Sequence, residues 1–187
     1  MRSARACVRV VGVGLLGAAA LWAATTNIAP DAVTHATHGY NVFEGDLASL
    51  TDGLYPGNAA DSGAFTVETK GNLVFAFGQS RAIDRVRLYV GDNAGRYAAV
   101  AYRGARYDTD SGQTDASAAE FVADALDESM AQNAWVELAF PTDTRADYVE
   151  VNTQSGATFY EIQILADGGS TPVQPVSWAA VKSGEGR

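Results

Sequence analysis

The chain has 187 residues, of which 47% are hydrophobic and 19% charged. This composition excludes an intrinsically disordered protein and suits one folded domain. The 13 basic and 22 acidic residues give a net charge of −9 at pH 7. Nucleic acid and anionic membranes both attract basic proteins, so we expect neither as a partner.

Residues 1–24 are predicted to be a secretory signal peptide. Three arginines precede an uncharged apolar run over residues 10–24, and Ala18-Ala19-Ala20 offers a cleavage site, with Ala23 or Ala24 as the alternatives. The run is short for a membrane span, which needs about 20 apolar residues, although an uncleaved anchor is the alternative. Cleavage would leave ten basic and 22 acidic residues, a net charge of −12, and would remove Cys7, the only cysteine. We therefore expect a secreted protein, extracellular or periplasmic, with no disulfide and no stable membrane span.

The remaining chain divides by composition into three parts. Residues 25–39 lack periodicity and are predicted to be a linker. Residues 40–166 carry the patterned sequence of a folded domain. After Asp167 the chain becomes rich in Gly and Pro, so residues 167–187 are predicted to be a linker and a C-terminal tail.

Short runs of alternating apolar and polar residues fill the domain and predict β-strands. Val86, Leu88 and Val90 alternate with polar neighbours, which places them on a core face. By the same reasoning Tyr160, Ile162 and Ile164 face inward, while their neighbours Phe159, Glu161 and Gln163 face outward. Other runs begin near residues 65, 73, 97, 135 and 148. The pattern predicts an all-β protein, an antiparallel β-sandwich of about eight strands.

One segment departs from the strand pattern. Residues 108–133 contain seven acidic residues and no basic one. A capping-box pattern, Ser117-Ala118-Ala119-Glu120, precedes apolar residues near helical spacing, from Phe121 to Met130. We expect a short helix or a long loop inserted between strands.

Several motifs together resemble the discoidin, or coagulation factor V/VIII C-type, modules of the galactose-binding-like superfamily. They are Leu50-Thr51-Asp52-Gly53 near the start, the apolar segments 73–78 and 83–90 in the centre, and the segments 147–151 and 159–164 near the end. The resemblance covers residues 40–166. It implies an eight-stranded jelly roll with loops gathered at one end, which binds sugars, glycans, phospholipid headgroups or protein partners.

The resemblance also implies a structural Ca²⁺ ion beside the Asp-Gly loop, closed by a glutamate in the last strand. The matching positions are Asp52 and Glu161. Calcium accepts six to eight oxygen ligands, including loop carbonyls, so these residue types suit it. The alternative is that Asp52 caps its own turn and that Glu161 is a solvated strand residue.

Aromatic and arginine residues in expected loops are the candidate ligand-binding residues. Tyrosine rings suit stacking on a sugar, and arginine donates paired hydrogen bonds to hydroxyl or carboxylate groups. The alternative is that these side chains only cover sheet edges. The candidates are Tyr55, Tyr97, Tyr102, Arg103, Arg106 and Tyr107.

The sequence gives little support for catalysis. The only histidines, His35 and His38, precede the strand region, and no G-x-S-x-G motif occurs. A G-x-G-x-x-G pattern at residues 12–17 lies inside the leader, without the β-α-β unit that a dinucleotide site requires. We therefore predict a secreted, non-enzymatic module that recognises carbohydrate or another cell-surface ligand through loops. A structural or adhesion subunit of the cell envelope, binding a protein partner, is the alternative.

Overall fold

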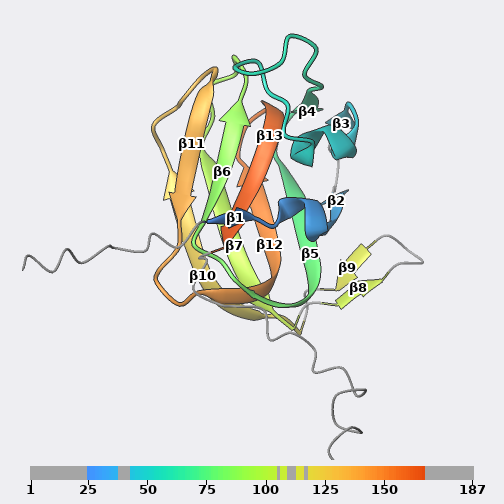
Figure 1. The fold of residues 1–187 in the computed structure, drawn as a ribbon, viewed down its shortest axis with the longest axis vertical. Coiled ribbons are helices and arrows are strands. Elements are labelled where there is room, and N and C mark those ends of the chain that lie inside the picture. Colours follow the sequence, from blue (N-terminus) through green and yellow to red (C-terminus); the bar gives the residue numbers. More distant parts are fainter. Residues whose placement is uncertain (1–24, 38–42, 105, 109–112, 116–117, 167–187) are drawn as a thin grey trace, which may run out of the picture.

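The computed structural model describes residues 25–37, 43–104, 106–108, 113–115 and 118–166. In this part of the chain two antiparallel sheets form a sandwich (Figure 1). Sheet A contains, in spatial order, β11 (Ala134–Ala139), β6 (Arg85–Val90), β13 (Ala157–Ala166), β4 (Phe65–Val67) and β3 (Phe43–Glu44), with β1 (Thr26–Asn27) also paired to β13. Sheet B contains β10 (Glu120–Asp127), β7 (Tyr97–Arg103), β12 (Arg145–Thr153), β5 (Gly71–Ala82) and β2 (Val33–Thr37).

The smaller elements are a separate hairpin of β8 (Arg106–Asp108) and β9 (Gln113–Asp115), and two 3-10 helices, η1 (Ala29–Asp31) and η2 (Leu47–Thr51). No helix in the described ranges is long and apolar enough to cross a membrane. The predicted all-β antiparallel sandwich is confirmed. The predicted signal peptide and the predicted C-terminal tail lie outside the described residues.

Inward-facing side chains of both sheets form one hydrophobic core. Val86, Leu88 and Val90 of β6 are fully buried, in the phase that their alternation predicts. Leu88 lies opposite Val136 on one neighbouring strand and Ile162 on the other. Burying one such side chain contributes roughly 1.5–3 kcal/mol. This burial fixes the register, so the remaining side chains of β6 point away from the core: Arg85, Arg87 and Tyr89.

A β-bulge interrupts the alternation in β13. Phe159 pairs with Val90 and Glu161 pairs with Tyr89, so Tyr160 is the extra residue between them. Phe159 is therefore buried in the core and Tyr160 is only half-buried. The prediction that Tyr160 faces inward and Phe159 outward is wrong, because a bulge shifts the phase of the strand by one residue.

The segment predicted as a linker, residues 25–39, is part of the sandwich as far as the structure describes it. The side-chain oxygen Oδ1 of Asn27 accepts hydrogen bonds from the backbone amides of Ala29 and Ile164, which attaches β1 and η1 to β13. β2 pairs with β5 over five residue pairs and forms one edge of sheet B. The linker prediction fails here because short edge strands carry too few residues to show a period.

The segment predicted as a helix or a long loop forms β10 instead. Its residues 120–127 pair with β7. Ala123 is buried against the core while its neighbour Asp124 is exposed, so burial alternates from one residue to the next as it does in a strand. The backbone groups at the edge of β7 provide hydrogen-bond partners that the local sequence does not reveal, so tertiary pairing overrides the helix-like spacing.

The loop between β3 and β4, residues 45–64, begins and ends at one close backbone contact. Gly45 has a φ of +111°, and a Cβ atom placed on it would lie 2.2 Å from the carbonyl oxygen of Ala64. Within the loop, Asp46 caps η2 by accepting a hydrogen bond from the amide of Ala48 at 2.9 Å, and Leu50 is fully buried. The loop is therefore closed at its base and anchored in the core.

Replacing Gly45 should open the base of this loop. We expect Gly45→Ala to lower the free energy of unfolding by about 2 kcal/mol more than Gly78→Ala, measured by urea unfolding. Gly78 is the matched control, because it also has a positive φ, +65°, but a Cβ atom placed on it would have no neighbouring atom within 4 Å. Equal losses in both variants would show that the close contact at Gly45 contributes nothing.

Candidate functional site

Four aromatic side chains gather on the outer face of sheet A. Trp135 lies opposite Tyr89 in the β11–β6 pairing, and their ring centroids are 5.4 Å apart. Tyr160, displaced outward by the bulge, lies 6.1 Å from Tyr89. Tyr55 from the 45–64 loop completes the group at 5.0 Å from both Tyr89 and Trp135. We call these four residues the aromatic cluster; all are half-buried, so part of each remains accessible.

Tyr55 is held in this position by a local turn. The backbone amide of Tyr55 donates to Oδ1 of Asn58 at 2.8 Å, and Nδ2 of Asn58 donates to the carbonyl oxygen of Gly53 at 2.8 Å. These two bonds fold residues 53–58 into a compact turn. The turn presents the Tyr55 ring to sheet A, so the loop and the sheet share one aromatic surface.

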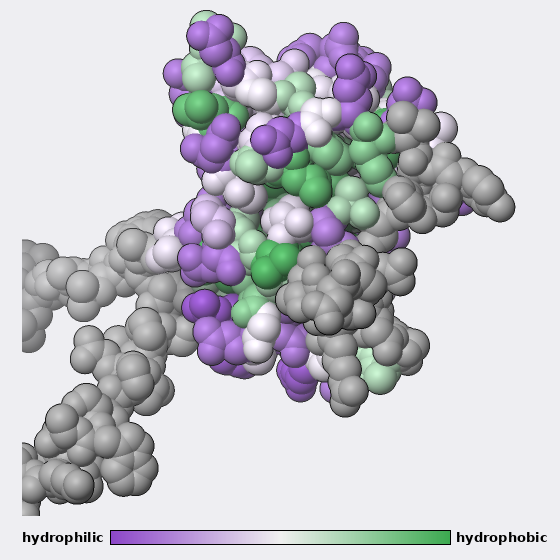
Figure 2. Space-filling view, turned by 90° about the vertical axis from the view of Figure 1, so that its right-hand side faces the viewer, coloured by the Kyte–Doolittle hydropathy of each residue, from purple (hydrophilic) through white to green (hydrophobic). Residues whose placement is uncertain are grey.

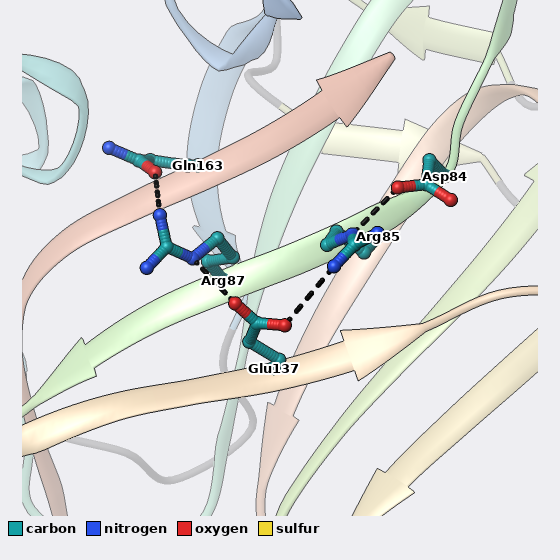
Figure 3. Close-up of polar contacts among 5 residues, drawn as sticks. All are labelled: Asp84, Arg85, Arg87, Glu137 and Gln163. Atoms are coloured by element: carbon teal, nitrogen blue, oxygen red, sulfur yellow. Dashed lines mark hydrogen bonds and ion pairs between the residues drawn. The ribbon is translucent and has the colours of Figure 1, made fainter. Parts of the chain in front are cut away.

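A polar network continues the same outer face beside the aromatic cluster (Figure 3). Glu137 lies between two arginines of β6, 3.2 Å from Nη1 of Arg85 and 3.1 Å from Nε of Arg87. Arg85 also contacts Asp84 at 2.6 Å, and Arg87 donates to Oε1 of Gln163 at 3.2 Å. Two arginines thus face two carboxylates, so the network is balanced in charge.

Arg87 joins the polar network to the aromatic cluster. Its guanidinium carbon lies 4.4 Å from the centroid of the Trp135 ring, within the range of a cation–π interaction. Asp84, and after it Glu137, raises the pKa of Arg85 above its ordinary value. Arg85 therefore remains a charged donor, and the ion pairs with Glu137 hold both arginines at the edge of the cluster.

Glu161 lies under the 45–64 loop and is fully buried, with 0% of its surface exposed. Its Oε2 accepts a hydrogen bond from the backbone amide of Gly53 at 3.0 Å, while its Oε1 has no hydrogen-bond partner. Burial, and to a lesser extent the carboxylate of Asp52, raises the pKa of Glu161 to about 7. A buried carboxylate oxygen without a donor, next to a second carboxylate, fits the oxygen ligands that a hard cation prefers.

No three His, Cys, Asp or Glu side chains come together within the ranges that the structure describes. A cation beside Asp52 and Glu161 would therefore need backbone carbonyl oxygens as further ligands. Oδ1 of Asp52 accepts a hydrogen bond from the amide of Leu54 at 2.8 Å, so the alternative of a turn-capping role is also present in the geometry.

The ligand-binding residues predicted from the sequence do not form one site. Tyr97 is fully buried in the core, 5.8 Å from the ring of Phe159, and is unavailable to a ligand. Tyr55 belongs to the aromatic cluster on sheet A, whereas Tyr102 lies on the outer face of sheet B. Arg103 is exposed at the end of β7.

The side chains of the last two candidates, Arg106 and Tyr107, lie outside the described part of the structure, although their backbone forms β8. Of the remaining four candidates, the prediction fails for Tyr97 because this residue has the same inward phase as Ala99 and Ala101. Loop composition alone gave no information about this phase.

Sequence reasoning did not select Tyr89, Trp135, Tyr160 or Arg87 as candidates. For Tyr89, Trp135 and Arg87 the signal was present, since the alternation of β6 and β11 already places these side chains on the outer face. Large aromatic side chains pointing outward on two strands would have been a better criterion than tyrosines in loops. Tyr160 could not be found this way, because its outward position depends on the bulge.

The raised pKa of Glu161 makes stability depend on pH. Because the folded protein binds this proton more tightly than the unfolded chain, the free energy of unfolding falls as pH rises from about 4.5 to about 7. With divalent cations chelated, we expect the wild type to lose up to about 3 kcal/mol over this range relative to Glu161→Gln. Urea unfolding at a series of pH values measures the difference, with Glu44→Gln at an exposed position as control. An identical pH dependence in wild type and Glu161→Gln would contradict this.

Comparison with solved structures shows which known proteins share the fold. The family 32 CBM (carbohydrate-binding module) from C. perfringens NanJ, in complex with galactose, matches with a TM-score of 0.50 and 15% identity, over 76% of this chain and 99% of that chain. CpGH89CBM32-5 from Clostridium perfringens, in complex with GalNAc-β-1,3-galactose, matches with a TM-score of 0.50 and 14% identity, over 74% and 99%. The Streptococcus pneumoniae β-galactosidase BgaA matches with a TM-score of 0.52 and 13% identity, over 71% and 90%.

In sequence, no protein-family model and no curated protein matches the chain. At these low identities the structural matches concern the fold alone. They show that the chain has the β-sandwich fold of the CBM32 modules, which is the kind of fold that the resemblance of the sequence motifs implied.

Proposed function

We propose that this protein is an exported, non-enzymatic module that binds glycans through the outer face of sheet A. The observation that carries the proposal is the aromatic cluster, half-exposed beside a charge-balanced network of arginine, glutamate and glutamine. A shared fold with binding modules, two of them solved with galactose-containing ligands, supports the same function. The export part of the proposal rests on the predicted signal peptide.

The cluster offers the two kinds of contact that a sugar needs. Aromatic rings supply apolar surface for the C–H groups of a pyranose, and a few fixed polar groups orient its hydroxyls. Next to Trp135 on the same face, the guanidinium group of Arg87 is a hydrogen-bond donor and the side-chain oxygen of Gln163 is an acceptor. The network has no excess positive charge and the chain is acidic, so an uncharged sugar is favoured over an anionic one.

We further propose a structural Ca²⁺ ion at Asp52 and Glu161. When bound, the ion would compensate the buried negative charge of Glu161, whose Oε2 accepts from the amide of Gly53 and whose Oε1 has no hydrogen-bond partner. The same turn carries Tyr55, so a cation there would hold the loop against sheet A. The proposal is supported by the unpartnered oxygen of Glu161 and by its closeness to Asp52.

Glycan binding should depend on Trp135. We expect Trp135→Ala to weaken binding by about tenfold or more, because it removes the central ring of the cluster and the ring under Arg87. The measurement is a glycan array with the full chain, followed by calorimetric titration of the bound sugars. Leu54→Ala is the matched control, since Leu54 is 42% exposed, adjacent to Tyr55 and not aromatic. Thermal unfolding of each variant checks that the fold is retained.

Two outcomes would contradict the proposed function. The first is an array without signal in the presence and absence of Ca²⁺. The second is glycan binding that Trp135→Ala leaves unchanged, which would place the site elsewhere on the molecule.

Ca²⁺ should stabilise the fold through Glu161. We expect saturating Ca²⁺ to raise the Tm by about 5 °C or more, because a ligand that binds only the folded state adds its binding free energy to stability. The shift should be lost in Glu161→Gln and retained in Glu44→Gln. Differential scanning calorimetry measures it, with Mg²⁺ as the comparison cation. A Tm that does not respond to Ca²⁺ in the wild type would exclude the site.

A further inference from the structure

The outer face of sheet B carries two rows of side chains that cross all five strands. Strand register places the members of each row directly opposite one another. The first row is mostly apolar and aromatic: Val33, Ala76, Tyr148, Tyr102 and Phe121. The second row contains two carboxylates: His35, Val74, Glu150, Val100 and Asp124.

The accessible part of the first row lies on β7 and β10. Phe121 is 57% exposed, and Tyr102 next to it is half-buried. Their ring centroids are 6.4 Å apart in an edge-to-face arrangement, and Tyr148 supports Tyr102 from the other side at 5.7 Å. At the β12–β5 side the row is buried, with Tyr148 at 3% exposure. The face therefore presents one small aromatic surface and not a continuous groove.

The two carboxylates stand beside this aromatic surface. Glu150 and Asp124 flank Val100 on the neighbouring strands, so their backbones are about 10 Å apart. Burial raises the pKa of Glu150, and a hydrogen bond with the side chain of Asn72 partly offsets this rise. Burial, and after it the carboxylate of Glu150, raises the pKa of Tyr102. Strand register places Glu150 diagonally opposite Tyr102 on the same face.

No arginine or lysine occurs in either row. Three arginines of sheet B lie beyond the rows near strand ends, and all are engaged: Arg81 contacts Asp31 at 3.7 Å, Arg103 contacts Glu120 at 3.9 Å, and Arg145 donates to the carbonyl oxygen of Ser80 at 3.4 Å. The polar network of sheet A differs in charge, because both of its carboxylates, Asp84 and Glu137, contact an arginine. Figure 2, which shows one side of the sandwich, has apolar surface in its middle with hydrophilic surface around it.

We infer that the Phe121–Tyr102 surface of sheet B is a second binding site, specific for a cationic saccharide, an amino sugar with a free ammonium group. The aromatic rings offer a surface for the pyranose ring and a cation–π partner for its ammonium group. Glu150 and Asp124 supply the negative charge on one side. The site is independent of the aromatic cluster, which lies on the opposite sheet.

A saccharide fits this surface better than a basic peptide. The ammonium group of an amino sugar is fixed to the ring, so stacking and charge pairing form together. A lysine side chain must instead immobilise a flexible stem of four carbons, which costs conformational entropy. The accessible rings also cover a small area, which suits one or two sugar rings and not an extended peptide.

The test compares three probes on the full chain by calorimetric titration: glucosamine oligomers, N-acetylglucosamine oligomers of the same length, and oligolysine. We expect glucosamine oligomers to bind at least about tenfold more tightly than the N-acetylated ones, since acetylation removes the charge and leaves the ring. Phe121→Ala should weaken this binding by about tenfold. Asp124→Asn and Glu150→Gln should each weaken it by about threefold to fivefold.

Control variants keep the outcome interpretable. Trp135→Ala removes the centre of the cluster on sheet A and should leave glucosamine binding within about twofold of wild type. Met130→Ala removes another exposed hydrophobic side chain, at 48% exposure, and should also have no effect. If Glu150→Gln fails to fold, the exposed Asp124→Asn variant still tests the charge.

Four results would overturn the inference. Equal affinity for the charged and N-acetylated oligomers would remove the role of the ammonium group. Glucosamine binding that persists in Phe121→Ala would remove the aromatic contact. Oligolysine binding as tight as glucosamine binding, with the same loss in Phe121→Ala, would identify a surface for basic peptides. Loss of binding in Trp135→Ala alone would assign the glucosamine binding to sheet A.

Discussion

Pairing of β13 with β6 places Leu88 opposite Ile162 inside the sandwich, and Tyr89 opposite Glu161 outside it. The inside pair contributes to the core, and its burial is what fixes the register of both strands. This register also determines which side chains lie on the outer face of sheet A. The aromatic cluster and the Arg85–Glu137–Arg87 network are therefore consequences of packing on the other side of the sheet.

The bulge at Tyr160 modifies this face at one point. It adds a residue to β13 without disturbing the buried positions that follow, so Ile162 and Ile164 stay in the core. It also turns an aromatic side chain outward, where it joins Tyr89. Bulges occur where a strand must redirect a side chain. Here the redirected residue stands next to Glu161, the most unusual buried group in the described part of the chain.

The sequence was sufficient for the strands with a regular alternation and insufficient for the two edge strands of sheet B. Residues such as Leu88 in β6 sit on strands long enough to show two or three periods, and their inward phase was predicted correctly. β2 and β10, at the two edges of sheet B, were predicted as linker and as helix or loop. Edge strands pair on one side only, so part of their pattern follows solvent exposure and not the core.

The candidate site was predicted in part. Asp52 and Glu161 were selected as a pair from family-like motifs, and the structure brings them together under one loop. The candidate tyrosines were selected by loop composition, which carries no information about phase, and the three whose side chains the structure describes, Tyr55, Tyr97 and Tyr102, divide among the core and both outer faces. The alternation of β11 and β6 already placed Trp135 and Arg87 on an outer face, but their contact depends on the pairing of these two strands, which are distant in the sequence.

The 45–64 loop is closed at its base and attached to sheet A at two further points. Gly45 contacts Ala64 at its base, Gly53 donates to Glu161 at its middle, and Tyr55 packs on Trp135 near its tip. A loop fixed only at its ends can open by local unfolding at small free-energy cost. This one must break contacts with β13 and β11 to open, so it belongs to the same cooperative unit as sheet A. A surface carried by such a loop keeps its shape between encounters with its ligand, and association requires little ordering of the protein.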